Sequence, residues 1–158
     1  MRRMLLLAML LALGGCAANT YDSRSAQLAY WSNHYEKQAA AGDLKWSEYY
    51  KGLYAHFFFI PELPGYDLYL RWSIAQLEAA LAVEGGKVSA EAFTSFRNQM
   101  NLSMRSFAAS GGRQRSAEQI DSFDLVLRLH ENQAMGWYGK AINCVATDFN
   151  RVYTAKCE

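Results

Sequence analysis

Residues 67–84 read DLYLRWSIAQLEAALAVE, and apolar side chains recur in this segment every three or four residues. That period matches the α-helix, in which such positions share one face. Two apolar rows start at Leu68 and Leu70, and together they predict a wide buried face. We therefore expect this helix at the centre of the fold. Three of its polar side chains are left for solvent: Arg71, Gln76 and Glu78.

Glycine and proline residues divide the rest of the chain into further helices. Both prolines of the sequence, Pro61 and Pro64, precede the central segment, and proline cannot continue a helix. Gly85 and Gly86 follow it, and Ser89 is a typical N-cap for the next helix. The spacing predicts four more helices: from about residue 23 to Gly42, over 46–58, between Ser89 and Gly111, and from Ser116, the start of a capping box with Gln119, to about Trp137.

The predicted fold class is all-α, a single bundle of about five helices with a short C-terminal tail. The 158 residues suffice for one domain, and 51% hydrophobic residues are too many for a disordered chain. Nearly equal numbers of basic residues (16) and acidic residues (15) argue against a nucleic-acid partner. No apolar run reaches the length of an ordinary membrane-spanning helix.

The first residues are typical of a secretory signal peptide. Arg2 and Arg3 form a positive start, residues 4–13 are apolar, and small residues follow. Ten apolar residues are too short to span a bilayer core of ~30 Å at ~1.5 Å per residue. An ordinary secretory signal that happens to contain a cysteine is the alternative interpretation.

The sequence Leu13-Gly14-Gly15-Cys16 resembles the lipobox of bacterial lipoproteins, and this resemblance covers residues 1–17. It implies cleavage before Cys16, a diacylglycerol on the Cys16 sulfur, and an acyl chain such as palmitate on the new amino group. The membrane would then be a partner through this lipid anchor, with no other cofactor expected. In this class an Asp after the cysteine often marks the inner membrane. Ala17 therefore favours the outer membrane, with the domain on its periplasmic face.

The expected organisation has four parts: a cleaved signal peptide (1–15), a lipidated tether (16–22), a helical domain (23–139) and a C-terminal tail (140–158). Removing the signal leaves 14 basic and 15 acidic residues. A nearly neutral domain is not drawn to anionic surfaces by its net charge.

Cys144 and Cys157 are the two cysteines that remain after Cys16. An even pair in an exported protein predicts a disulfide, since the periplasm is oxidising. The flanking residues suit a two-stranded ribbon, with Asp148 and Asn150 near its turn. A helix that ends near Cys144, with the tail pinned onto it, is the alternative.

Aromatic side chains are unusually dense between residues 46 and 72. One interpretation is a bulky core whose tyrosine hydroxyls lie at the rim. The other is a binding patch for a peptide, an acyl chain or the membrane interface. The candidate patch residues are Trp46, Tyr50, Phe57, Phe58, Phe59, Tyr66, Tyr69 and Trp72.

Catalytic and metal-binding motifs are absent from the sequence. His34, His56 and His130 form no metal-ligand spacing. His130 falls on an apolar row, which predicts a mostly buried histidine, while His34 is expected at a solvated surface. No nucleophile elbow or phosphate loop occurs. Three methionines are expected in the core: Met100, Met104 and Met135.

These observations lead to three functional hypotheses. The favoured one is a non-catalytic accessory module, anchored by lipid, that docks another component of the cell envelope, much as pilotins of secretion systems are small helical lipoproteins. The second is a binder of a small apolar ligand or lipid in the aromatic region. The third is a peptidoglycan-directed enzyme, for which Glu48, Glu62, Asp67 and Glu78 are candidate carboxylates.

Overall fold

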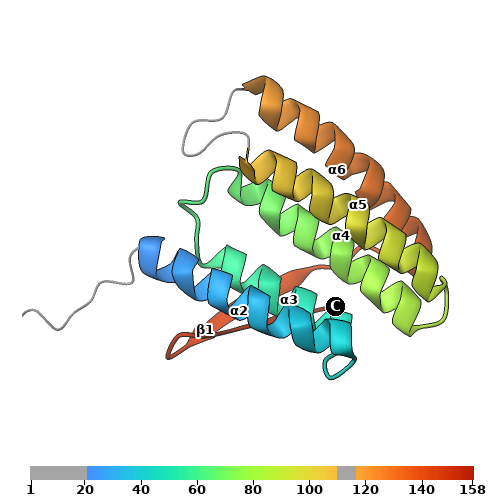
Figure 1. Cartoon of the computed structure of the whole chain (residues 1–158), viewed down its shortest axis with the longest axis horizontal. Coiled ribbons are helices and arrows are strands. Elements are labelled where there is room, and N and C mark those ends of the chain that lie inside the picture. Colours follow the sequence, from blue (N-terminus) through green and yellow to red (C-terminus); the bar gives the residue numbers. More distant parts are fainter. Residues whose placement is uncertain (1–20, 110–116) are drawn as a thin grey trace, which may run out of the picture.

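The computed structural model describes residues 21–109 and 117–158. These residues form five helices followed by one antiparallel hairpin (Figure 1). The elements are α2 (Tyr21–Ala41), α3 (Trp46–Phe58), α4 (Tyr66–Glu84), α5 (Ala90–Ala109), α6 (Ala117–Tyr138), β1 (Cys144–Phe149) and β2 (Val152–Cys157). The predicted all-α bundle with a hairpin tail is confirmed. The lipobox around Cys16 and the Ser116 cap lie outside the described residues.

Ser89 and Gly42 mark helix ends as predicted, whereas α2 begins earlier than expected. The Ser89 hydroxyl accepts the Ala92 N–H at 3.1 Å, which confirms this N-cap. Gly42 ends α2 with a φ of +84°, a conformation that glycine adopts without strain. α2 begins at Tyr21, so the end of the expected 16–22 tether is already helical.

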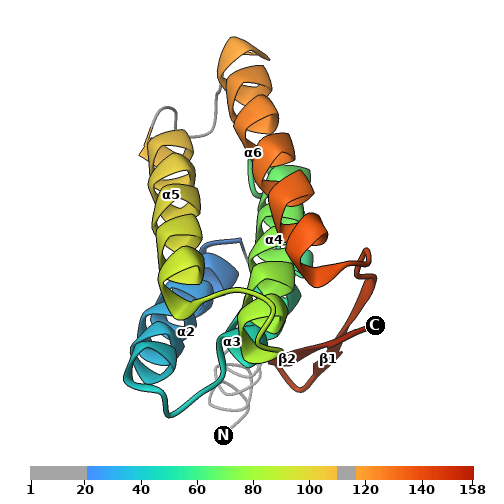
Figure 2. The ribbon, with the colours of Figure 1, turned by 90° about the vertical axis from the view of Figure 1, so that its right-hand side faces the viewer.

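Helix α4 lies at the centre of the bundle, as predicted. It packs against α3 on one side and against α6 on another, and α5 also contacts it (Figure 2). α2 packs against α3, and the hairpin lies on α3 as well. The order of packed elements therefore runs from the hairpin through α3 and α4 to α6.

The three polar side chains of α4 that were expected at the surface are covered by neighbouring helices, so that prediction was wrong. Gln76 is 0% exposed and Glu78 is 5% exposed. Arg71 is half-buried, and its guanidinium donates to Asp124 and Glu131 of α6. The reason is that neighbouring helices cover more of α4 than its two apolar rows account for.

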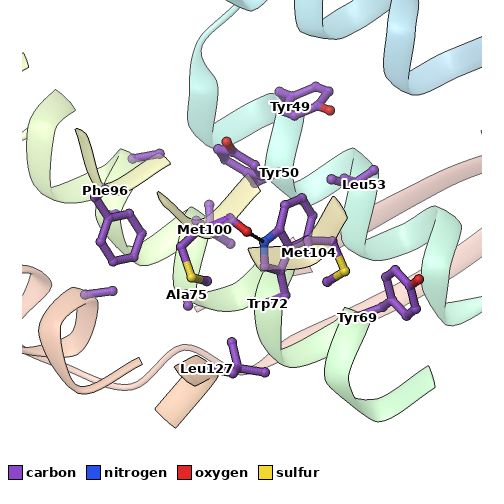
Figure 3. Packing of buried hydrophobic residues seen from close by; sticks show 14 of the residues in the cluster. Tyr49, Tyr50, Leu53, Tyr69, Trp72, Ala75, Phe96, Met100, Met104 and Leu127 are labelled. Atoms are coloured by element: carbon purple, nitrogen blue, oxygen red, sulfur yellow. Dashed lines mark hydrogen bonds between the residues drawn. The ribbon is translucent and has the colours of Figure 1, made fainter. Parts of the chain in front are cut away.

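The core is rich in aromatic and sulfur-containing side chains (Figure 3). The Trp72 indole N–H donates to the Met100 carbonyl at 3.3 Å, so this buried polar atom is paired. Met100 and Met104 are buried, as expected. Met135 is 43% exposed, which contradicts its expected place in the core. It follows Glu131 by one helical turn and lies at the edge of the α6 face that contacts α4.

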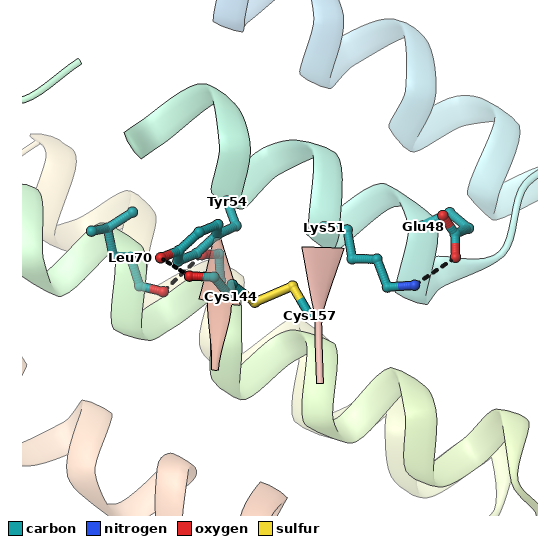
Figure 4. The surroundings of a disulfide bond; sticks show 7 residues. Glu48, Lys51, Tyr54, Leu70, Cys144 and Cys157 are labelled. Carbon is teal, nitrogen blue, oxygen red and sulfur yellow. Dashed lines mark hydrogen bonds and ion pairs between the residues drawn. A yellow bond between two sulfur atoms is a disulfide. The ribbon is translucent and has the colours of Figure 1, made fainter. Parts of the chain in front are cut away.

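The tail forms the ribbon alternative, closed by the predicted disulfide between Cys144 and Cys157 (Figure 4). The two cysteines lie directly opposite each other, with Cα atoms 4.1 Å apart. Asn143 and Glu158 exchange two backbone hydrogen bonds just outside the disulfide. The Tyr54 hydroxyl of α3 donates to the Cys144 carbonyl at 3.2 Å, which attaches this end of the hairpin to the bundle.

Candidate functional site

The aromatic residues of the candidate patch do not form one exposed surface. Four of them lie in the core, each less than 9% exposed: Tyr50, Phe57, Tyr69 and Trp72. Trp46, Phe59 and Tyr66 are half-buried, and Phe58 is 39% exposed. Most of this segment is therefore core, because α3 and α4 are adjacent helices that bury these rings against each other and against α5.

A small cleft nevertheless opens beside this core. Its volume is about 140 Å³, and it lies between α2, α3, α4 and α5. The lining residues are Glu36, Tyr49, Tyr50, Trp72, Asn101, Met104 and Arg105. Of the eight candidate patch residues, Tyr50 and Trp72 line this cleft and the other six do not. Pockets for drug-sized ligands start at roughly 300 Å³, so only a small molecule or fragment fits.

Arg97 of α5 contacts Glu36, one of the polar residues that line this cleft. Its guanidinium lies 4.1 Å from the centre of the Trp46 ring and 3.3 Å from a carboxylate oxygen of Glu36. Its positive charge also lowers the pKa of the Tyr50 phenol, which partly offsets the effect of burial. This one cation thus connects α2, α3 and α5.

The two cleft tyrosines are held in their neutral form. Burial raises the pKa of the Tyr50 phenol well above its usual value, and burial followed by the nearby Glu36 raises that of Tyr49. Their hydroxyls therefore remain protonated at neutral pH and are available as donors. The cleft combines aromatic faces, a methionine and neutral hydroxyls, which suits a small molecule with an apolar body and one polar group.

A second polar cluster joins α4 to α6. Arg71 bridges Asp124 and both carboxylate oxygens of Glu131, and Arg128 donates to Asp124 at 2.7 Å. The hydrogen bond from Arg71, followed by that from Arg128, lowers the pKa of Asp124. Every charged group of this cluster has an opposite partner, as expected for a structural ion-pair network.

Glu78 lies near this network, but its pKa is raised, whereas that of Asp124 is lowered. Burial raises the pKa of its carboxyl to about 7, a hydrogen bond with the Ile142 backbone opposes the shift, and Glu131 adds to it. From the sequence, Glu78 was expected at the surface. The pattern of α4 alone does not predict that the chain after α6, at Ile142, packs over this carboxyl.

The other candidate carboxylates lie apart from Glu78 and are exposed. Glu48 pairs with Lys51 at 2.8 Å on α3, and Glu62 pairs with Arg24 of α2 at 2.6 Å. Asp67 is exposed in the first turn of α4. The structure therefore brings none of these three together with Glu78.

His56 is the most deeply buried of the three histidines, and His130, which was expected to be mostly buried, is more than half buried as well. His56 is 2% exposed, its ring packs 4.7 Å from Trp31 and 4.9 Å from Tyr153, and burial lowers its pKa to about 4. His130 is half-buried, with Nδ1 2.8 Å from the Val126 carbonyl, because it lies at the edge of the α6 face that contacts α5. His34 is exposed, as predicted.

Among residues 21–109 and 117–158, no three His, Cys, Asp or Glu side chains are grouped so as to hold a metal ion. In the same residues, no helix has the length and apolar character needed to cross a bilayer.

Sequence reasoning missed an exposed apolar pair at the tip of the hairpin. Phe149 and Val152 flank the two-residue turn and are 78% and 61% exposed. A bulky apolar residue next to Asn150, where turns usually carry polar side chains, was the available signal.

Comparison with known proteins gave no match: no family model, no curated protein and no solved structure is similar to this chain.

Proposed function

We propose that this protein is a lipoprotein of the bacterial outer membrane, anchored through Cys16, and that its helical domain is a non-catalytic module that docks another envelope component on the periplasmic side. The lipobox resemblance of residues 1–17 supports the anchor. Two acyl groups on one cysteine suit stable membrane attachment, which a single chain provides only weakly.

The outward face of α6 carries the docking part of this proposal. Leu125 and Leu129 are 63% and 64% exposed, and their spacing of four residues places them on one face of the helix. α6 lies at the upper edge of the bundle in Figure 1, and its contacts with α4 and α5 are on its inner side. Neighbouring exposed leucines on a helix are typical of surfaces that bind a partner protein.

The test is affinity capture of the acylated protein from membranes of its native host. The double variant Leu125→Ser/Leu129→Ser removes the apolar face, and Leu102→Ser on α5, where Leu102 is 71% exposed, is the matched control. We expect one envelope protein to be captured by the wild type and by the control, and to be lost with the double variant and with Cys16→Ala. Repeated capture of no partner while a lipid co-purifies would contradict docking.

The cleft supports the second candidate, binding of a small apolar ligand. Met104 lines it from α5 opposite Tyr50 of α3. Native mass spectrometry of the purified protein should then detect a bound small molecule that the cleft-filling variant Met104→Trp no longer retains. A wild type that carries no such molecule from its host would rule out this candidate.

A further inference from the structure

The tip of the hairpin presents an apolar surface to solvent. Phe149 and Val152 are cross-strand partners, so their side chains share one face of the ribbon. Both are more than 60% exposed, and Phe149, at 78%, has the larger fraction. The opposite face is covered, because Tyr153 is buried and its ring stacks on Phe59 at 5.1 Å.

This tip lies beside the beginning of α2. The Gln27 side-chain amide donates to the Arg151 carbonyl in the turn at 3.1 Å. Gln27 is six residues after Tyr21, which corresponds to about 9 Å along the helix axis. Figure 1 shows the first turns of α2 and the hairpin turn at the same end of the molecule. The Arg24–Glu62 ion pair brings the α3–α4 loop to this end as well.

The length of the tether places this end near the membrane. This step rests on the proposed function, in which Cys16 is acylated and lies at the bilayer surface. Tyr21 comes five residues after Cys16, and a fully extended chain covers at most about 18 Å over those five steps. α2 itself is about 30 Å long, so a tether of this length can bring the hairpin end of the domain to the bilayer surface but keeps Ala41 at least about 12 Å from the anchor.

We propose that Phe149 and Val152 insert into the interfacial region of the lipid bilayer and give the protein a second membrane contact beside the lipid anchor. Aromatic and apolar side chains with a polar backbone around them suit this region, where one side is apolar and the other wet. Arg151, which is exposed in the turn between them, then lies at the depth of the lipid phosphates.

The turn is built to present these side chains. Asn150 and Arg151 have positive φ angles of 51° and 67°, a pair that is typical of the tight turns in β-hairpins. The Asp148 carboxylate accepts the Arg151 N–H at 2.8 Å, and Gln27 holds the Arg151 carbonyl. With its turn held from both sides, the tip keeps Phe149 directed outward. Two membrane contacts fix the orientation of the domain, whereas a lipid tether alone leaves it free to rotate.

The experiment measures contact between the tip and acyl chains. The acylated full-length variant Phe149→Trp is reconstituted in vesicles of phosphatidylcholine and phosphatidylglycerol with brominated acyl chains, and its fluorescence is compared with that in unbrominated vesicles. Leu102→Trp is the matched control, because Leu102 is 71% exposed on α5, and α5 does not contact the hairpin within the described residues. The wild type supplies the signal of the four native tryptophans.

We expect Phe149→Trp to lose at least about half of its added emission to bromine, since an interfacial ring reaches the upper acyl chains, while Leu102→Trp stays unquenched. Equal quenching of both variants, or none for Phe149→Trp, would overturn the inference. A blue shift of its emission that depends on protein concentration, without quenching, would assign the tip to a second copy of the chain and also overturn it. Intact mass of the same sample separates the two proposals: an unacylated Cys16 refutes both, whereas an acylated Cys16 without quenching refutes only the tip contact.

Discussion

The indole of Trp31 in α2 lies directly against Gly52 in α3. A Cβ placed on Gly52 would stand 2.3 Å from Cζ2 of that ring and 2.4 Å from Cη2. The ring is also held by its neighbours, since it stacks on Tyr35 at 4.8 Å and on Tyr49 at 5.7 Å. The absence of a side chain at position 52 is therefore what allows α2 to approach α3 this closely.

Gly52→Ala should destabilise the protein by about 1–3 kcal/mol, because a rigid ring must move to admit the methyl group. Gly136→Ala in α6 is the matched control, since a Cβ there meets no atom within 4 Å. That control should gain about 0.5–1 kcal/mol from helix propensity alone. Urea unfolding followed by circular dichroism measures both, and equal effects of the two substitutions would contradict the close approach of α2 and α3.

Loss of the Cys144–Cys157 disulfide should lower the free energy of unfolding by about 3 kcal/mol, because the unfolded chain regains the freedom of a 12-residue loop. The double variant Cys144→Ser/Cys157→Ser and the reduced wild type should agree. Unfolding with and without reductant measures the effect. A reductant-dependent change that persists in the double variant would show that the disulfide is not its cause.

The free energy of unfolding should decrease as the pH rises from about 4.5 to 7, because the Glu78 carboxyl loses its proton in this range. Burial raises its pKa in the folded protein to about 7, whereas the unfolded chain has the ordinary value of 4.5. Between these values the folded state binds more protons than the unfolded state, so this carboxyl costs stability progressively from about pH 4.5 to 7, about 3 kcal/mol in total. Glu78→Gln removes that cost.

Wild type and Glu78→Gln should therefore be similarly stable at pH 4, and the variant should be more stable at pH 8. Denaturant unfolding at a series of pH values measures the difference, in which contributions common to both proteins cancel. A constant difference across the whole range would show that Glu78 does not titrate in this window.

His56 should stay neutral down to about pH 4, because burial against Trp31 and Tyr153 disfavours its charged form. The effect of pH on stability through His56 is opposite to its effect through Glu78. With a folded pKa below the unfolded value of 6.5, the stability from this histidine is complete above pH 6.5 and is lost as the pH falls toward 4. The pKa of His56 can be measured directly from its imidazole proton resonances in a pH titration. A midpoint near 6.5 would show that the ring is exposed to water.

The helices and the disulfide could be predicted from local pattern. Apolar spacing, the Ser89 cap and the two prolines predicted α3 and α5 closely, because these signals act within a few residues. The central place of α4 followed from its two apolar rows. The candidate site was predicted only in part: Tyr50 and Trp72 line a cleft, but its volume and its α5 side depend on packing between distant segments.

Sequence alone determined the helical bundle and the pairing of Cys144 with Cys157, since each depends on residue types at short, fixed spacings. It left the hairpin as one of two alternatives for the tail, and the lipid anchor at Cys16 stays a prediction. Tertiary structure alone decided that Glu78, Gln76 and His56 are buried while Met135 and Phe149 are exposed. The physical reason is that burial depends on how many neighbours an element has. α4 is enclosed by several helices, whereas α6 and the hairpin each pack on the bundle through one side and leave the other to solvent or to a partner.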